Sequence, residues 1–218
     1  MSKLLIFGNE QMAEIAHYYF STDSEYEIVA FVVDKEYIRD KSFKGLPVYA
    51  FEEATNLFPK NEYRYFVALG YSKMNRVREL IFNRIKDAGY SFASYISSRC
   101  DWLSESAPGE NCFILENNTI QPFSKIGDNV TMWSGNHLGH HSTVQDHCFV
   151  SSHVVISGNV TIGNNSFLGV NATIADGLVI APFTLLGAGV IMTKNSIEHG
   201  AYVPEKAILL NKTSDYFI

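Results

Sequence analysis

The sequence predicts two domains, an α/β domain with a Rossmann-like sheet over residues 1–98 and an all-β parallel β-helix over 99–218. Two observations support this. In the first part, short apolar runs alternate with helical segments, as in a mostly parallel sheet. In the second part, every sixth residue from Ile114 to Met192 is aliphatic or Met. A period of six fits neither a helix nor an alternating strand, and it is the signature of hexapeptide β-helix repeats.

The elements of the first domain follow from apolar runs and turn residues. Strands are expected over 3–7, 26–33, 63–69 and 92–96, with a turn and short strand at 45–48. Helical segments are expected from residue 11 to about 20 and over 52–57. Ser72 is the expected N-cap of a last helix, which stops near Gly89. We expect the apolar face of this helix to carry Met74, Val77, Leu80, Ile81 and Ile85.

The second domain is built from the six-residue repeat. Three hexapeptides make one triangular coil, so residues 18 apart stack and the period-six side chain points inward. An irregular first coil is expected over 99–109, and the period fails after Met192. A loop at 195–200, a short strand at 201–203, a turn at 204–207 and an apolar C-terminal tail over 208–218 complete the domain.

Composition excludes several classes of protein. The net charge of −6, without a basic face, argues against a nucleic-acid partner. No apolar run is long enough to predict a membrane span, and no signal peptide is recognised at the start, so a cytoplasmic location is expected. Cys100, Cys112 and Cys148 form no CxxC pair, and we interpret them as reduced thiols.

Candidate substrate-binding residues lie where the parallel strands of the first domain end. They are Gly8, Asn9, Gln11, Asp34, Gly70 and Tyr71. The first loop is not G-x-G-x-x-G, so no dinucleotide cofactor is predicted. A nucleotide diphosphate can still bind the amides of the helix that begins near Gln11, with Asp34 on a ribose or base. The alternative is that the glycines only turn the chain and that Asp34 is a solvated strand end.

Five histidines cluster in the β-helix, at positions 137, 140, 141, 147 and 153. Leu138 and Val144 point inward, so His140 and His141 lie in a turn and point outward. A neutral imidazole there can act as a general base in acyl transfer from a thioester. The alternative is that these histidines are tolerated in polar turns or stack between subunits.

The spacing of this cluster bears on a metal site and on a carboxylate partner for an imidazole. Zinc in a β-helix needs histidines about two coils apart, but the residues 36 positions from His140 are Ser104 and Asp176. No metal is therefore predicted. Asp146 can orient an imidazole, although Asp128, Asp146 and Asn164 share one turn position, which favours a capping role.

These residues resemble a known family. Gly139-His140-His141, the segment 157–163 and the segment 167–171, together with the preceding α/β domain, are similar to the PglD/NeuD/VioB/PerB family of bacterial sugar acyltransferases. The resemblance covers essentially the whole chain. It implies a left-handed β-helix, a homotrimer, and acetyl-CoA bound between adjacent β-helices.

The resemblance also implies roles for particular residues. His140 matches the catalytic base, and His141 stands where relatives commonly have Glu or Asp. The nucleotide-linked amino sugar matches the N-terminal positions given above, and the segment 70–76 resembles members that act on 4-amino-4,6-dideoxy sugars, with Arg76 near a phosphate. The cofactor-binding positions are Phe149, His153, Val170, Gly187, Ala188 and Gly189.

The expected activity is N-acetylation of a nucleotide-linked 4-amino-4,6-dideoxyhexose by acetyl-CoA. The amine attacks the thioester directly, and His140 accepts the proton, with His141 and Asp146 as candidates that assist it. Two alternatives stay open. One is O-acetylation of a sugar hydroxyl, as in sialic-acid modification. The other is a non-catalytic nucleotide-sugar-binding protein.

Overall fold

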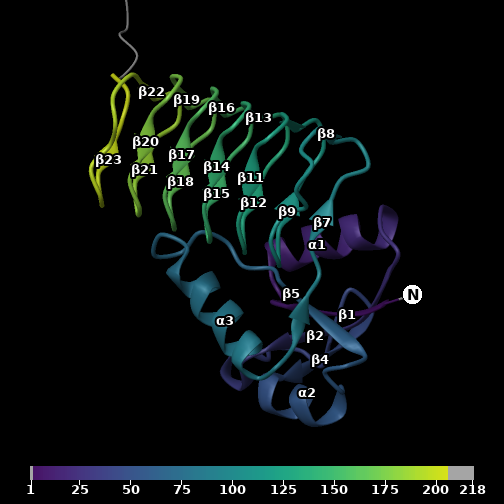
Figure 1. Cartoon of the computed structure of the whole chain (residues 1–218). Coiled ribbons are helices and arrows are strands. Elements are labelled where there is room, and N and C mark those ends of the chain that lie inside the picture. Colours follow the sequence, from purple (N-terminus) through teal and green to yellow (C-terminus); the bar gives the residue numbers. More distant parts are fainter. Residues whose placement is uncertain (1, 206–218) are drawn as a thin grey trace, which may run out of the picture.

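A computed structural model describes residues 2–205 and shows an α/β domain followed by a parallel β-helix (Figure 1). The tail expected at 208–218 and the end of the turn expected at 204–207 lie outside the described residues. Within 2–205, no helix has the length and apolar content needed to cross a membrane.

The α/β domain is a six-stranded sheet with helices on both sides. The elements are β1 (Ser2–Phe7), α1 (Gln11–Thr22), β2 (Tyr26–Val33), the 3₁₀ turn η1 (Lys35–Tyr37), β3 (Ser42–Phe43), β4 (Leu46–Ala50), α2 (Phe51–Leu57), β5 (Tyr63–Val67), α3 (Arg76–Asp87) and β6 (Ser91–Phe92). The strand order is β3-β4-β2-β1-β5-β6, and only β3 pairs antiparallel. Taken in chain order, the parallel strands lie 3-2-1-4-5, the order of a doubly wound sheet.

The alternation of side chains in β1 shows how this sheet is buried on both faces. Leu4 and Ile6 pack in one core with α1, whereas Leu5 and Phe7 pack in the opposite core with α2 and α3. A strand that is covered on both faces must be apolar at successive positions, which is why 4–7 is a continuous apolar run.

Two expected elements differ in the structure. The strand expected over 92–96 is divided: β6 completes the α/β sheet, while Tyr95–Ile96 already pairs with the β-helix. The last helix begins at Arg76 rather than after Ser72, and Leu80 is exposed. Asn75 precedes this helix with φ of +64°, and its side-chain amide donates to the carbonyls of Asn165 and Ser166. This contact with the β-helix overrides the local capping preference.

The β-helix consists of two-residue strands, which are separated by four-residue turns from β9 to β22. They are β7 (Tyr95–Ile96), β8 (Asp101–Trp102), β9 (Phe113–Ile114), β10 (Thr119–Ile120), β11 (Lys125–Ile126), β12 (Thr131–Met132), β13 (His137–Leu138), β14 (Thr143–Val144), β15 (Phe149–Val150), β16 (Val155–Ile156), β17 (Thr161–Ile162), β18 (Phe167–Leu168), β19 (Thr173–Ile174), β20 (Val179–Ile180), β21 (Leu185–Leu186), β22 (Ile191–Met192) and β23 (Ala201–Tyr202).

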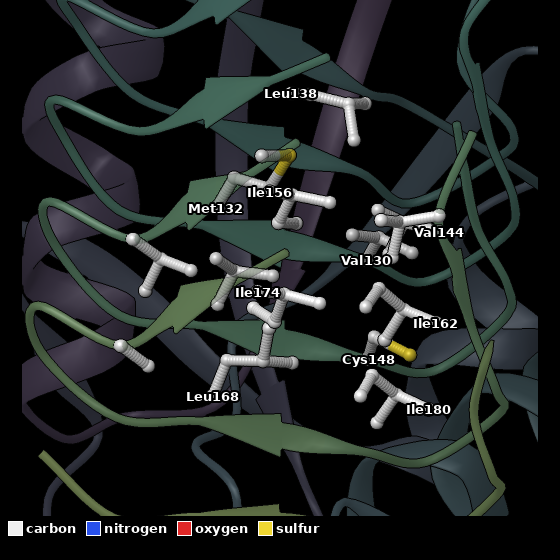
Figure 2. Packing of buried hydrophobic residues seen from close by; sticks show 14 of the residues in the cluster. Val130, Met132, Leu138, Val144, Cys148, Ile156, Ile162, Leu168, Ile174 and Ile180 are labelled. Atoms are coloured by element: carbon white, nitrogen blue, oxygen red, sulfur yellow. The ribbon is translucent and has the colours of Figure 1, made fainter. Parts of the chain in front are cut away.

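The strands form three parallel sheets, which are the faces of a triangular prism. Face 1 contains β7, β9, β12, β15, β18, β21 and β23; face 2 contains β8, β10, β13, β16, β19 and β22; face 3 contains β11, β14, β17 and β20. His137 pairs with Thr119 and with Val155, so each coil takes 18 residues. The second residue of each strand from β9 to β22 is the period-six residue, and all of these lie in one buried core (Figure 2).

The turns between faces form three corners, each with a column of residues in the left-handed backbone region. Corner 3–1 has Asn111, Asn129, His147, Asn165 and Phe183; corner 1–2 has Asn117, Gly135, His153, Asn171 and Gly189; corner 2–3 has Phe123, His141, Asn159 and Gly177. Asn, Gly and His tolerate a positive φ better than most residues do. The turn geometry therefore favours these residue types at every sixth position, and Phe123 and Phe183 are the exceptions in the three columns.

The α/β domain docks on corner 3–1 and face 1 through α3 and the loop before it, and α1 packs on Phe113 of the first coil and bonds Glu116 through Tyr19 (Figure 1). Arg78 is 1% exposed, and its Nη2 donates to the carbonyl oxygens of Asn129, His147 and Cys148 at 3.2, 3.1 and 3.0 Å. Burial lowers the pKa of this guanidinium to about 10, so it stays charged at neutral pH. Carbonyl dipoles thus take the place of a carboxylate at this interface.

Inward and outward neighbours of one strand should respond differently to truncation. Ile156 is fully buried in the prism and Val155, beside it in β16, is 41% exposed. Ile156→Ala is expected to lower the free energy of unfolding by about 2–5 kcal/mol, because it leaves a cavity between stacked coils. Val155→Ala should change it by less than about 0.5 kcal/mol. Urea denaturation measures both, and equal losses would contradict the inward register.

Candidate active site

His140 follows β13 at corner 2–3, where it is exposed. Its backbone N–H donates to the side-chain oxygen of Gln121 at 2.9 Å, and its carbonyl accepts from the backbone N–H of Asn159 at 2.9 Å. The coils before and after therefore hold the main chain of His140 in place. The imidazole projects outward, as the six-residue register predicts.

The nearest polar partner of the His140 ring is the next residue. Nδ1 of His140 lies 3.2 Å from Nδ1 of His141, and the two rings are nearly perpendicular. His141 has φ of +59° and leans on the ring of Phe123, one coil earlier, with centroids 4.8 Å apart. The backbone conformation and this contact together hold His141 beside His140. In such a pair one Nδ1 donates and the other accepts.

Three of the five clustered histidines occupy left-handed turn positions. His141, His147 and His153 have φ of +59°, +61° and +59°. Part of the cluster is therefore explained by turn geometry, as the alternative interpretation of the sequence expected. His137 lies in a strand of face 2. His140 has neither explanation.

Asp146 is remote from His140. It lies at corner 3–1, where its Oδ1 accepts the backbone N–H of Asp128 at 2.8 Å. Asp128 accepts the backbone N–H of Glu110 in the same way, also at 2.8 Å. These carboxylates cap the turn one coil below, so Asp146 does not orient His140 within this chain. The capping role that the sequence favoured is the observed one.

The expected cofactor residues separate into two groups. Phe149 is 3% exposed, because it stacks on Phe167 and is covered by Tyr71 at 4.9 Å. It belongs to the domain interface, which corrects the expectation that it contacts a cofactor. The others line successive turns of corner 1–2; they are His153, Val170, Gly187, Ala188 and Gly189.

The expected nucleotide-binding residues gather at one edge of the α/β sheet. Gly8 donates to the carbonyl of Val32 at 2.9 Å, and Ala68 donates to the carbonyl of Phe7 at 2.9 Å. Gly8 has φ of +130°, and a Cβ there would lie 2.8 Å from the carbonyl oxygen of Ala68. A glycine is required for this close approach. Asn9 donates to the carbonyl of Tyr37, and Gln11 begins α1.

Asp34 has a partner that sequence reasoning missed. Its Oδ1 lies 2.6 Å from Nη2 of Arg84, whose guanidinium also lies over the ring of Phe51. Arg84 comes from α3 and is far from Asp34 in the chain, so no local pattern signals the pair. Gly70 and Tyr71 lie in the loop after β5, and Tyr71 also packs on Phe149 and Phe167.

A surface hollow was also missed. It is lined by Lys73, Met74, Arg76, Phe183 and His199. Arg76 lies over the ring of Phe183 at 4.5 Å, and Phe183 stacks on His199. Arg76 was expected near a phosphate, and the structure places it against an aromatic ring in this hollow. The residues come from both domains, so only the tertiary structure reveals that they meet.

Two of the three thiols lie in the core of the β-helix. Cys112 and Cys148 are fully buried, and burial raises the pKa of each thiol to about 12. Both are therefore protonated and inaccessible at neutral pH. In residues 2–205, no group of three or more His, Cys, Asp or Glu side chains has the arrangement of a metal site.

Comparison with known proteins connects this chain to solved structures only. No family model matches the sequence. No curated protein matches it either. The acetyltransferase domain of PglB from Neisseria gonorrhoeae FA1090 superposes with a TM-score of 0.80 at 20% identity, over 94% of this chain and 97% of that chain.

Two further solved structures superpose over nearly the whole of this chain. PerB from Caulobacter crescentus, in complex with CoA and GDP-perosamine, has a TM-score of 0.81 at 22% identity, over 94% of this chain and 95% of that chain. WeeI from Acinetobacter baumannii AYE has a TM-score of 0.78 at 18% identity, over 92% and 96%. The likeness extends across both domains, and at these identities it shows the fold.

The mostly buried imidazole of His147 is expected to make the stability of the protein depend on pH. It is mostly buried against α3, with Phe82 on its ring, and burial lowers its pKa despite the nearby carboxylate of Glu79. Below about pH 6.5 the unfolded chain binds this proton more readily than the folded chain, so stability falls on acidification. His147→Asn, which copies Asn129 and Asn165 in the same column, should reduce the loss of Tm between pH 7.5 and 5.5.

The matched control is His199→Asn. His199 also has a positive φ of +59°, but its side chain is 59% exposed. This variant should keep the wild-type dependence of Tm on pH. An unchanged pH dependence in His147→Asn would show that the buried imidazole does not contribute to acid sensitivity.

Proposed function

We propose that this chain is an acetyl-CoA-dependent N-acetyltransferase that acts on a nucleotide-linked 4-amino-4,6-dideoxyhexose. The observation that carries the proposal is the likeness across both domains to PerB, which was solved with CoA and GDP-perosamine, combined with the outward imidazole of His140 at corner 2–3. Membership of the PglD/NeuD/VioB/PerB family, with a Rossmann-like first domain and a left-handed helix, is part of the same proposal.

The reaction requires one proton acceptor near the amine. The amine nitrogen attacks the thioester carbonyl, a C–N bond forms, and an electron pair moves to the carbonyl oxygen. Nε2 of His140 takes the proton from the attacking nitrogen. When the tetrahedral intermediate collapses, the C–S bond breaks and the proton can pass to the departing thiolate. Backbone N–H groups of the turns are available to stabilise the oxyanion.

Acetyl-CoA is assigned to corner 1–2. His153, Val170 and Ala188 occupy successive turns of this edge, and Val170 is 43% exposed. Gly187 and Gly189 leave two positions of the last of these turns without a side chain, and a Cβ at Gly189 would meet no atom within 4 Å. This open strip suits an extended pantetheine chain. Phe149 has no part in it.

The nucleotide-linked sugar is assigned to the edge formed by Gly8, Asn9, Gln11, Asp34 and Gly70. The N-terminus of α1 presents free backbone N–H groups there, which suit a diphosphate. Arg84 neutralises part of Asp34 and fixes its orientation. The remaining carboxylate oxygen can accept a hydrogen bond from a ribose hydroxyl.

This assignment requires more than one copy of the chain. The α/β domain covers corner 3–1 and face 1, whereas His140 lies at corner 2–3 and the acetyl-CoA strip at corner 1–2. One prism cannot bring its different edges together. Packing of prisms side by side in a homotrimer would bring corner 2–3 of one copy to corner 1–2 and the α/β domain of another.

Removal of the imidazole tests the assignment of the base. His140→Ala should lower kcat at least about a hundredfold, the scale of a lost general base, with the oligomer intact. Release of free CoA thiol with a nucleotide amino sugar measures turnover. His199→Ala removes another exposed imidazole of the same β-helix and should leave kcat within about twofold. Near-wild-type turnover of His140→Ala would sink the assignment.

Ligand-induced stabilisation tests the two binding assignments separately. CoA and nucleotide-linked 4-amino sugars should each raise Tm in a concentration-dependent manner. Acetyl transfer to the amino sugar, and not to its 4-hydroxy counterpart, is expected. Stabilisation by the nucleotide sugar without any response to CoA would instead indicate a binding protein, and transfer to the hydroxyl compound would indicate an O-acetyltransferase.

A further inference from the structure

We propose that Asp176 is the carboxylate partner of His140, acting across Gly158 as a positioning residue. The inference rests on the proposed function, because it concerns the proton acceptor of that reaction. Residue 141 is a histidine and not a carboxylate, so another group must supply the negative charge that a Glu or Asp after His140 would otherwise supply.

His140, Gly158 and Asp176 occupy the same position in three successive turns of corner 2–3. Adjacent coils are separated by the ordinary strand spacing, so the first and third positions lie roughly 10 Å apart. A side chain at the middle position would separate the other two. Glycine at 158 leaves the space between them open.

The atoms that face this space come from both side chains. A Cβ built on Gly158 would lie 2.7 Å from Nε2 of His140, 2.6 Å from its Cε1, and 2.8 Å from Oδ1 of Asp176. The imidazole and the carboxylate thus lean over the same glycine from opposite sides. Gly158 itself is buried beneath them. Its φ is not positive, so turn geometry alone does not demand glycine here.

The carboxylate of Asp176 is available for this role. Within residues 2–205 it accepts no hydrogen bond and forms no ion pair, and it is exposed in the single chain. The charged or titratable side chains around it in the column are His140, its neighbour His141, and Lys194 one coil beyond. By contrast, Asp128 and Asp146 at corner 3–1 are both occupied by backbone N–H groups.

His141 and Asp176 together take the two roles that one Glu or Asp after the histidine would take: orienting the imidazole and supplying negative charge. In the tautomer that the reaction requires, Nδ1–H of His140 donates to Nδ1 of His141, which fixes the ring and leaves Nε2 unprotonated. Asp176 lies on the Nε2 side and stabilises the imidazolium that forms when Nε2 takes the proton from the amine. A neutral imidazole at 141 cannot supply this charge, whereas a carboxylate can.

The test compares Asp176→Asn with the wild-type protein over a range of pH. We expect kcat to fall about tenfold on the plateau, KM to change little, and the acidic limb of kcat/KM to move to lower pH, because His140 is then a weaker base. Asp176→Glu should restore part of the rate. Gly158→Ala, which places a methyl group between the two side chains, should lower kcat by at least about tenfold.

A second readout does not depend on activity. In protein with labelled histidines, NMR follows protonation of the His140 imidazole, which should occur at lower pH in Asp176→Asn. Asp87→Asn, at the exposed end of α3, is the matched control and should change neither measurement.

The outcomes separate the two proposals. If wild-type protein transfers no acetyl group, the proposed function fails, yet the NMR shift still tests the pair. If wild-type protein is active and His140→Ala is not, the function stands. In that case, wild-type kcat, an unchanged acidic limb and an unchanged titration of His140 in Asp176→Asn would overturn the inference.

Discussion

In-register stacking of coils is the constraint on which the rest of this molecule depends. Each strand pairs with the residues 18 positions before and after it. Residues at the same position of successive coils therefore form a column along the prism. The inner column is aliphatic because stacking removes it from water. The corner columns are mostly Asn, Gly and His because the backbone is left-handed there. The β-helix residues of the proposed site also lie in such columns.

The docking of the α/β domain uses one of those columns as its surface. The carbonyls exposed at the left-handed turns of corner 3–1 point at α3, and Arg78 and Asn75 satisfy them with side-chain N–H groups. Directional hydrogen bonds of this kind hold the two domains in one orientation, and Tyr71 closes the edge over Phe149 and Phe167. Three carbonyl dipoles stabilise the buried guanidinium through its Nη2, while its Nε and Nη1 have no hydrogen-bond partner among the described residues.

A consequence of this docking is that each corner has a separate use. Corner 3–1 holds α3, the last coils of corner 1–2 present Val170, Ala188 and two glycines, and corner 2–3 presents His140 with His141 and Asp176. The column rule also explains why clustered histidines are a weak signal in a β-helix. His141, His147 and His153 satisfy the turn, so their number says more about backbone conformation than about chemistry. His140 differs because Gly158, one coil away, leaves an open space between the imidazole and Asp176, which lies two coils away.

The sequence by itself determined the period, the inward residues and the outward direction of His140, because a repeat of six converts directly into stacked coils. It also predicted β2 over 26–33 and the gathering of strand ends, since these depend on local apolar patterns. It did not predict the start of α3, the burial of Phe149, the Asp34–Arg84 pair or the placement of His140 and Asp176 on either side of Gly158. Those depend on contacts between residues far apart in the chain, and on an empty volume over Gly158, which only the tertiary structure decides.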